Sequence, residues 1–232
     1  MEINERGRKI IDILISSHFA SIADLASAIY TSEATVRREI SKLETLGAVK
    51  TVYGGVVIAE YEKAPVPISL RDKENSAEKE LLAERAATLV RDNSTVILDS
   101  SSTVRRMCKH LSEKRGLTVI TNNLRVVEAL RGSAVRIILT GGTFVPERDC
   151  FVGHLAESFI GCLKADAVFL SSQGVSENGD ITDSSEEEIS MRKVMMSVSR
   201  EKIFLADGSK IGREYPLVLA NISEMNECII GK

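Results

Sequence analysis

Thr95-Val-Ile-Leu-Asp99-Ser-Ser-Ser-Thr103 joins an apolar run to an aspartate and then to four consecutive hydroxyl residues. Helical spacing begins directly after it, which predicts a strand that enters a helix across a short turn. The first amides of a helix have no internal partner and attract anions, so such a turn can hold a phosphate. Further donors would come from the side chains of Ser100, Ser101, Ser102 and Thr103. One serine would be enough to cap the helix, and this simpler interpretation stands beside that of a small-anion site.

The residues around this stretch alternate between strand-like apolar runs and helical spacing. Strands are expected over residues 95–98, 117–120, 135–139, 167–170 and 202–206. Helices are expected over residues 77–91, 103–114, 124–130, 156–163 and 186–199. Alternation of this kind predicts an α/β domain over residues 77–232, with a mainly parallel sheet that helices cover on both faces.

Polar residues follow the expected strands at the end where ligands bind in parallel α/β sheets. Besides Asp99 and the hydroxyl turn they are Thr121, Asn122, Asn123, Gly141, Gly142, Gly174, Asp207 and Lys210. Glycines allow backbone amides to approach a ligand closely. Lys210 would supply the positive charge that a phosphate requires, although it could equally be an ordinary surface lysine. Because these strand ends would meet at one edge of the sheet, together they predict a site for a small anionic effector.

The first 58 residues predict a winged helix-turn-helix. Apolar residues recur at helical spacing from Ile10, and Ser21-Ile-Ala-Asp24 is a capping box that opens a second helix. Ser32 is placed to cap a third helix after a three-residue break. The residues that follow alternate and then turn on Gly54-Gly55, as a hairpin wing does.

The exposed face of the third helix carries residues that we expect to contact DNA. They are Ser32, Thr35, Arg37, Arg38 and Lys42, together with Tyr53, Gly54 and Gly55 in the wing. Cationic side chains reach phosphates and guanine edges, and small polar residues allow a helix to sit deep in the major groove. Residues 1–56 contain seven Lys/Arg and seven Asp/Glu, so the expectation depends on local clustering. A merely solvated charged face is the alternative.

Composition places the chain among ordinary globular proteins, with 232 residues, 27% charged residues and a net charge of −3. No apolar run approaches the roughly 20 residues of a membrane helix. The charged N-terminus shows no signal peptide, so a cytoplasmic location is expected. The cysteines and histidines lack metal-type spacing, which argues against a metal site. Prolines and mixed charge over residues 59–76 indicate a linker between a domain at 1–58 and a domain at 77–232.

The third helix and the wing carry the signature of a known family. Ser32-Glu-Ala-Thr35-Val-Arg37-Arg38-Glu39, followed by Gly47 and Tyr53-Gly54-Gly55, resembles the N-terminal signature of the DeoR family of bacterial transcriptional repressors. Glu39 stands where that family usually has aspartate, which keeps the charge. The resemblance implies a winged helix-turn-helix followed by a C-terminal sensor that binds phosphorylated sugars or related metabolites.

The polar strand ends also match the sensor domain of this family, whose fold is similar to those of ribose-5-phosphate isomerase and CoA-transferases. Glu188 with Met191-Arg192-Lys193 falls where the family has a glutamate followed by a basic helix. Ser101 replaces a frequent glycine, which is expected to restrict the approach of the backbone to a ligand. The chain ends at Lys232, earlier than is common in the family, so shortened last elements are expected.

With these features, the resemblance to the DeoR family implies a repressor of a sugar or carbohydrate catabolic operon, modulated by a phosphorylated sugar. It would bind double-stranded operator DNA as a homo-oligomer, a dimer or tetramer, because two-fold operators match two-fold proteins. No catalytic residue, cofactor or metal is expected. The alternative is a sugar-phosphate isomerase or transferase fused to a DNA-binding domain. Carboxylates for it are Asp99, Asp180, Asp183, residues 186–188 and Asp207, but their spacing shows no carboxylate pair or nucleophile–base set.

Overall fold

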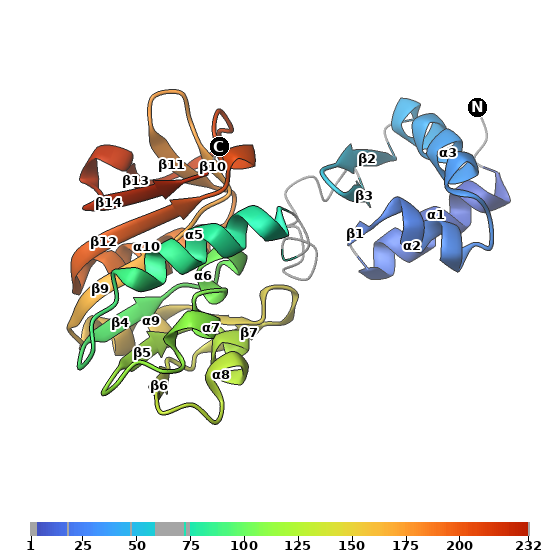
Figure 1. Cartoon of the computed structure of the whole chain (residues 1–232). Helices are drawn as coiled ribbons and strands as arrows, with labels where there is room; N and C mark the ends of the chain where they lie inside the picture. The colour runs from blue at the N-terminus through green and yellow to red at the C-terminus, as the bar shows by residue number, and fades with distance from the viewer. Residues whose placement is uncertain (1–3, 18, 47, 59–71, 73–74, 232) are drawn as a thin grey trace. The chain divides into compact units, whose positions relative to one another are not determined.

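The computed structural model describes residues 4–17, 19–46, 48–58, 72 and 75–231 (Figure 1). The chain divides into two compact units, Met1–Leu70 and Arg71–Lys232, and each is described by itself. Most of the expected linker at 59–76 lies outside the described residues, with Asp72, Asn75 and Ser76 as the exceptions. Among the described helices, none is both long enough and apolar enough to cross a membrane.

The N-terminal unit is a winged helix-turn-helix, as predicted. Its elements are α1 (Glu5–Ser17), β1 (Phe19–Ala20), α2 (Ile22–Ala28), α3 (Glu33–Thr45), β2 (Val49–Val52) and β3 (Gly55–Ile58). The three strands form an antiparallel sheet in the order β1-β3-β2. The helices bury one apolar stripe each, and Ile10, Leu25 and Val36 are fully enclosed in the shared core. This packing leaves the opposite face of α3 exposed.

The C-terminal unit is built on one parallel sheet of six strands, which confirms the predicted α/β class. The strand order is β14-β12-β9-β4-β5-β6. All five neighbouring pairs are parallel. The bounds are β4 (Thr95–Leu98), β5 (Thr118–Thr121), β6 (Arg136–Leu139), β9 (Ala165–Leu170), β12 (Ser199–Ala206) and β14 (Glu227–Ile230). Because the strands run in one direction, their carboxyl ends lie along one edge.

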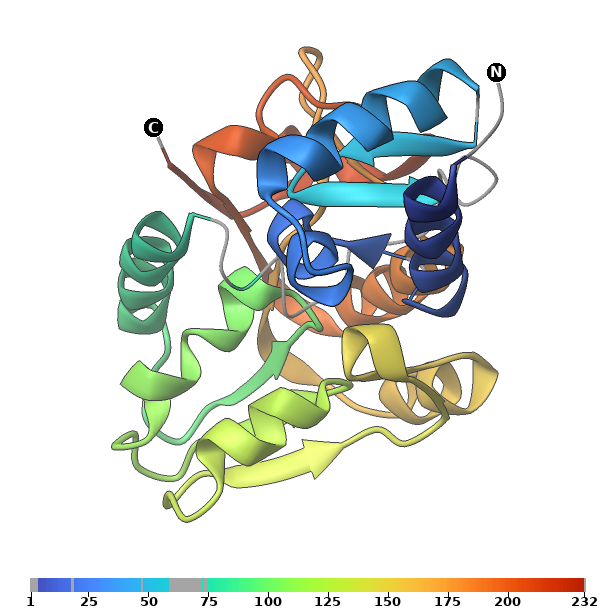
Figure 2. The same cartoon turned by 90° about the vertical axis from the view of Figure 1, so that its right-hand side faces the viewer.

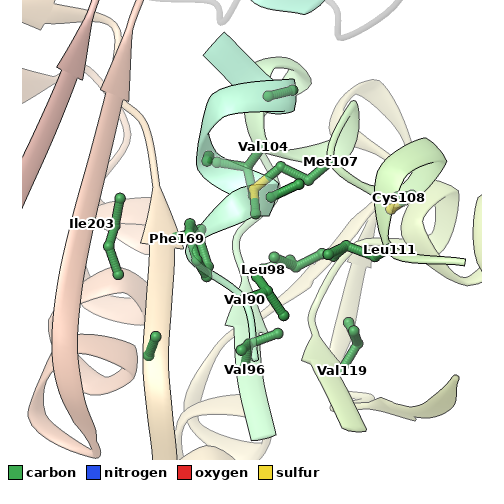
Figure 3. Packing of buried hydrophobic residues seen from close by; sticks show 14 of the residues in the cluster. Val90, Val96, Leu98, Val104, Met107, Cys108, Leu111, Val119, Phe169 and Ile203 are labelled. Atoms are coloured by element: carbon green, nitrogen blue, oxygen red, sulfur yellow. The ribbon is translucent and has the colours of Figure 1, made fainter. Parts of the chain in front are cut away.

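Helices cover both faces of this sheet (Figures 1 and 2). One face packs against α5 (Ser76–Thr88), α6 (Ser102–Arg105), α7 (Cys108–Leu111) and α8 (Leu124–Leu130). The other face packs against α9 (His154–Gly161) and α10 (Glu186–Ser197). Successive side chains of a strand point to opposite faces, so Leu98 enters the first core and Ile97 the second. Figure 3 shows the first core, where Val104 and Met107 lie close to Leu98 and Phe169.

The predicted helix over 103–114 is wrong as a single helix, because the structure divides it into α6 and α7. The break falls at Arg106 and Met107, and Met107 is fully buried in the core shown in Figure 3. The turn after β4 therefore opens a helix of only four residues, whose dipole is small compared with that of the long helix expected from the sequence.

Several short strands were not predicted. β7 (Thr143–Val145) and β8 (Cys150–Val152) form a hairpin, with η2 (Pro146–Arg148) between them. A separate antiparallel sheet contains β10 (Gly174–Val175), β11 (Asp180–Asp183) and β13 (Leu217–Asn221). Two further 3-10 turns are η3 (Gly208–Lys210) and η4 (Ile222–Glu224).

Candidate DNA-binding face and effector site

The start of α3 is held by two of the predicted DNA-contacting residues. The side chain of Ser32 accepts a hydrogen bond from the Thr35 backbone N–H at 3.3 Å. The Ser32 and Thr35 hydroxyls lie 2.9 Å apart. This is the predicted N-cap. Ser32 is exposed and Thr35 is half-buried, so both can lie near a nucleic acid at the N-terminus of α3.

The cationic residues of α3 lie on its exposed face. Arg37 forms a loose ion pair with Glu33 at 3.5 Å, and Arg38 is exposed. Lys42 donates to Glu39 at 3.0 Å, and Glu39 is buried and also accepts from Asn4 at 2.9 Å. The hydrogen bond from Lys42 lowers the pKa of Glu39 below its ordinary value. Glu39 therefore links α3 to the residue before α1 and shares Lys42 with any phosphate that this face binds.

A groove of about 580 Å³ lies between α3 and the wing. Arg37 and Gly54 are among the residues that line it. Tyr53 and Gly54 are exposed at the hairpin turn, where Gly54 has a φ of +82°. Gly55 is instead buried, and a Cβ there would collide with the Ala20 carbonyl oxygen of β1. Gly55 is thus required by packing within the wing, whereas Tyr53 and Gly54 remain at its surface.

The turn of the helix-turn-helix contains one exposed residue in an uncommon backbone conformation. Tyr30, in the turn between α2 and α3, is 95% exposed and has a φ of +54°. The left-handed region disfavours side chains with a Cβ, so glycine is the usual residue there.

In the C-terminal unit, Asp99 organises the turn after β4. One of its carboxylate oxygens accepts from the Ser101 N–H at 2.9 Å and from the Ser101 hydroxyl at 2.6 Å. The other oxygen accepts from the Ser171 N–H at 3.1 Å and from Arg192 Nε at 2.9 Å. Asp99 is 1% exposed. Its acceptor capacity is used inside the protein, so it positions the turn and the strand end of β9.

The four hydroxyls of the turn have different surroundings. The Ser101 side chain accepts from the Val104 N–H at 3.2 Å, so Ser101 caps α6, as in the simpler interpretation of this turn. Ser100 donates to Glu188 at 3.1 Å. The Thr103 hydroxyl is buried without a hydrogen-bond partner among the described residues. Ser102 is buried at the first position of α6.

The end of β5 is joined to this turn by side-chain amides. Asn123 donates to the Ser100 carbonyl at 3.0 Å and accepts from the Arg125 N–H at 2.7 Å, which caps α8. Thr121 donates to the Leu98 carbonyl at 2.8 Å. The Asn122 side chain donates to a backbone carbonyl of β8 at 2.9 Å, but its side-chain oxygen is buried without a partner among the described residues. Asn122 therefore keeps an acceptor available for a bound group.

The glycines differ in what they permit. Gly141 has a φ of +67° and open space around the position of a Cβ. Gly142 has a φ of +110°, and a Cβ there would lie 2.8 Å from the Val152 carbonyl oxygen. At Gly174 a Cβ would collide with the Arg213 carbonyl oxygen. Gly142 and Gly174 thus serve close backbone packing, and Gly141 has space beside it.

Asp207 and Lys210 lie together after β12. Lys210 donates to the Ser171 hydroxyl at 2.9 Å and to the Ser172 carbonyl at 2.5 Å, which connects this turn to the end of β9. Asp207 is fully buried and accepts from Asn75 at 2.8 Å. Burial acts to raise the pKa of Asp207, yet Lys210 and the hydrogen bonds that it accepts hold that pKa below its ordinary value. Asp207 is therefore a buried carboxylate beside a cation.

Arg192 is the central residue of the site that spacing alone missed. It projects from α10, its side chain is 2% exposed, and its three nitrogens bind three carboxylates. Nε lies 2.9 Å from Asp99, Nη1 lies 2.8 Å from Asp183, and Nη2 lies 3.2 Å from Glu188. Burial alone would lower the pKa of Arg192, but these carboxylates raise it above its ordinary value. The cluster joins the β4 turn, β11 and α10.

A second buried arginine comes from the β7–β8 hairpin. Arg148 is 8% exposed and donates to the Ser185 hydroxyl, the N-cap of α10, at 2.6 Å. Its Nε has no hydrogen-bond partner among the described residues. Nothing in its local sequence indicated burial, because the hairpin that carries it was not predicted. Within the described part of the chain, no group of His, Cys, Asp and Glu could hold a metal ion.

Each of the two units matches a model of a known protein family. Residues 6–62 match the DeoR-like helix-turn-helix domain, and residues 74–232 match the DeoR C terminal sensor domain. The HTH-type transcriptional regulator GolR of Listeria innocua is 32% identical over 90% of this chain and 82% of its own length. The transcriptional repressor AccR of Agrobacterium fabrum is 32% identical over 95% of this chain and 86% of its own.

Among solved structures, ribose 5-phosphate isomerase a from Methanocaldococcus jannaschii is similar over 60% of this chain and 55% of its own. The identity is 16% and the TM-score is 0.44. The family matches together span most of the chain, from the helix-turn-helix to the last strand of the sheet. The chain therefore belongs to the DeoR family of transcriptional regulators, with an N-terminal helix-turn-helix domain and a C-terminal sensor domain.

Proposed function

We propose that this regulator represses a sugar or carbohydrate catabolic operon and that a phosphorylated sugar binds its C-terminal unit at the ends of β4, β5, β9 and β12. In this proposal residues 1–58 bind DNA, residues 59–76 link the domains, and residues 77–232 sense the effector. The protein acts in the cytoplasm, where operator DNA is found.

One observation carries the effector proposal. The Thr103 hydroxyl, in the helix α6 that follows β4, and the Asn122 side-chain oxygen, directly after the neighbouring strand β5, are both buried without partners among the described residues. Buried polar groups are nearly always hydrogen-bonded, so these unpartnered groups after neighbouring strands favour a bound polar molecule. An ordered water could satisfy each group singly. A sugar hydroxyl can donate to the Asn122 side-chain oxygen, and either a sugar hydroxyl or a phosphate oxygen can accept from the Thr103 hydroxyl.

The charges around these groups favour a phosphate. Lys210 donates a hydrogen bond to the hydroxyl of Ser171, at the end of β9. The N–H of the same serine donates to Asp99 in the β4 turn. A lysine acts as a point charge toward phosphate. The single positive charge of Arg192 offsets part of the negative charge of the three carboxylates around it, which reduces the repulsion that an anion would otherwise meet.

The same cluster argues against the isomerase or transferase alternative. A general base needs an acceptor oxygen within reach of the substrate proton. Asp99 and Asp183 are buried and paired with Arg192. Asp207 is also buried, with Oδ1 hydrogen-bonded to Asn75 and Ser209 and Oδ2 3.9 Å from Lys79 Nζ. We therefore propose a binding site without catalysis. Two-fold operators favour a dimer or tetramer as the DNA-binding species.

A panel of phosphorylated sugars tests the effector proposal. D-ribose 5-phosphate, D-fructose 6-phosphate, D-glucose 6-phosphate and dihydroxyacetone phosphate are each compared with the unphosphorylated parent in thermal-shift experiments. At a ligand concentration of 100 times Kd, binding stabilises the native state by ~2.7 kcal/mol. We expect at least one phosphate to raise Tm and its parent not to. Thr103→Val, which removes only the hydroxyl, should weaken that response.

Gel shifts with an operator selected from random-sequence DNA by the full-length protein test the regulatory part. The phosphate that raises Tm should change operator affinity. Conversion of that compound, followed by NMR, would refute the non-catalytic proposal. If every phosphate behaves like its parent, the phosphorylated-sugar proposal is wrong.

A further inference from the structure

The first described residues of the C-terminal unit contact two separate loops of the proposed effector site. The segment concerned is the entrance segment, defined as Asp72 together with residues 75–79. In the sequence it directly follows the stretch that connects to the DNA-binding domain. We infer that the entrance segment transmits effector occupancy to the DNA-binding domain, an inference that rests on the proposed function.

The first contact comes from α6, the helix that begins in the hydroxyl turn. Arg105 Nη2 lies 2.6 Å from an Asp72 carboxylate oxygen. Arg106 Nη2 donates to the Asp72 backbone carbonyl at 2.6 Å, and its Nη1 lies 3.5 Å from Glu80. Both arginine side chains are at most a quarter exposed, so these charged contacts are less screened than surface pairs. Any displacement of α6 therefore acts directly on Asp72.

The second contact comes from the turn after β12. Asn75 donates to Asp207 at 2.8 Å, and Glu78 accepts from the Gly208 N–H at 3.2 Å. Lys79 Nζ lies 3.9 Å from Asp207, and both side chains are almost completely buried. The helix α5 that carries Glu78 and Lys79 packs beside α6 (Figure 1). The entrance segment is thus held from two strand ends at once.

The positions of these strand ends make the arrangement responsive. β4 and β12 are not neighbours, because β9 lies between them in the sheet. A phosphate bound between the β4 turn and Lys210 would contact both the β4 turn and the turn after β12, and would change the position of one relative to the other. The Nε atoms of Arg105 and Arg106 are buried without partners among the described residues, so the observed arrangement does not satisfy these guanidiniums fully. A second arrangement of the two arginines could therefore satisfy donors that this arrangement leaves without partners.

A coupling experiment on the full-length chain tests the inference. The measured quantity is the coupling factor, defined as the ratio of operator Kd with and without the sugar phosphate that gives the largest thermal shift in the panel above. Coupling between sites is typically about 5- to 150-fold in affinity. Arg105→Gln combined with Arg106→Gln removes the α6 contact, and Asn75→Ala removes a contact to the β12 turn. Lys109→Gln is the matched control, because Lys109 pairs with Glu80 at 2.9 Å in the same cluster.

We expect the coupling factor to fall to about twofold or less in the double arginine variant, and to fall in Asn75→Ala. The affinity for the sugar phosphate in the absence of DNA should stay within about threefold of wild type, and Lys109→Gln should retain the wild-type coupling factor. Circular dichroism and Asn75→Ala guard against misfolding of the double variant. A coupling factor unchanged in both kinds of variant would overturn the inference while leaving the proposed function intact. If the wild-type protein binds no sugar phosphate of the panel, or binds one without any change in operator affinity, both the inference and the proposed function are refuted.

Discussion

Replacement of Arg192 by methionine should strongly destabilise the C-terminal unit. The guanidinium is 2% exposed and binds Asp99, Asp183 and Glu188, each of which is also at most 2% exposed. Methionine fills similar space but leaves three carboxylates facing one another without a cation. Removing one partner of a buried ion pair typically costs ~3–5 kcal/mol. For a unit of this size ~1 kcal/mol shifts Tm by about 2–4 °C, so we expect a decrease of about 6–20 °C.

Differential scanning calorimetry of the full-length chain measures this change, with the transition of the N-terminal unit as an internal reference. Arg200→Met is the matched control, because Arg200 is 85% exposed and lies 3.8 Å from Asp166. Exposed pairs of this kind contribute ~0–1 kcal/mol. Arg192→Lys retains a charge without the planar fork of donors, so it should fall between wild type and Arg192→Met. A decrease below 2 °C in Arg192→Met would refute the account of a buried cluster in which one guanidinium stabilises three carboxylates.

Three further outcomes are expected. Arg37→Ala and Arg38→Ala should each weaken operator binding by ~1–3 kcal/mol in gel shifts if they reach base edges, and unchanged affinity in both would exclude α3 as the recognition helix. Ser102→Ala combined with Lys210→Ala should abolish the effector response and preserve DNA binding, whereas a retained response would place the site elsewhere. Tyr30→Gly should stabilise the N-terminal unit in thermal melts, because relief of ~1–2 kcal/mol of left-handed strain exceeds the ~0.5–1 kcal/mol entropic cost of glycine. A lower Tm would show that the exposed ring is needed for packing.

Much of the architecture was predictable because it depends on local patterns. The five strands expected in the parallel sheet correspond to β4, β5, β6, β9 and β12, with ends shifted by at most three residues. The capped helix α3 was equally predictable, since Ser32 precedes a regular apolar stripe. The split of the helix after the hydroxyl turn was not predictable, because Met107 is buried at the break and continues the apolar pattern.

The polar strand ends were also predictable as a group, but their individual roles were not. Ser101 and Asp99 belong to one turn in the sequence, yet whether they bind a ligand or each other depends on side-chain direction. The structure pairs them at 2.6 Å. It leaves Thr103 and Asn122 among the buried groups without hydrogen-bond partners in the described part of the chain, together with Asp207 Oδ2. A residue list taken from strand ends therefore combines groups that shape the site with groups that can face a ligand.

By itself the sequence determined the winged helix-turn-helix, the parallel sheet and the edge at which polar residues gather, because periodicity, capping and strand direction act over a few residues. Tertiary structure alone decided the buried charge cluster at the strand-end turn. Arg192 and Glu188 are four residues apart on α10, but Asp99 is 93 residues away in the sequence. The buried guanidinium of Arg192 is stabilised by three carboxylates, and these converge only once β4, β11 and α10 have packed together.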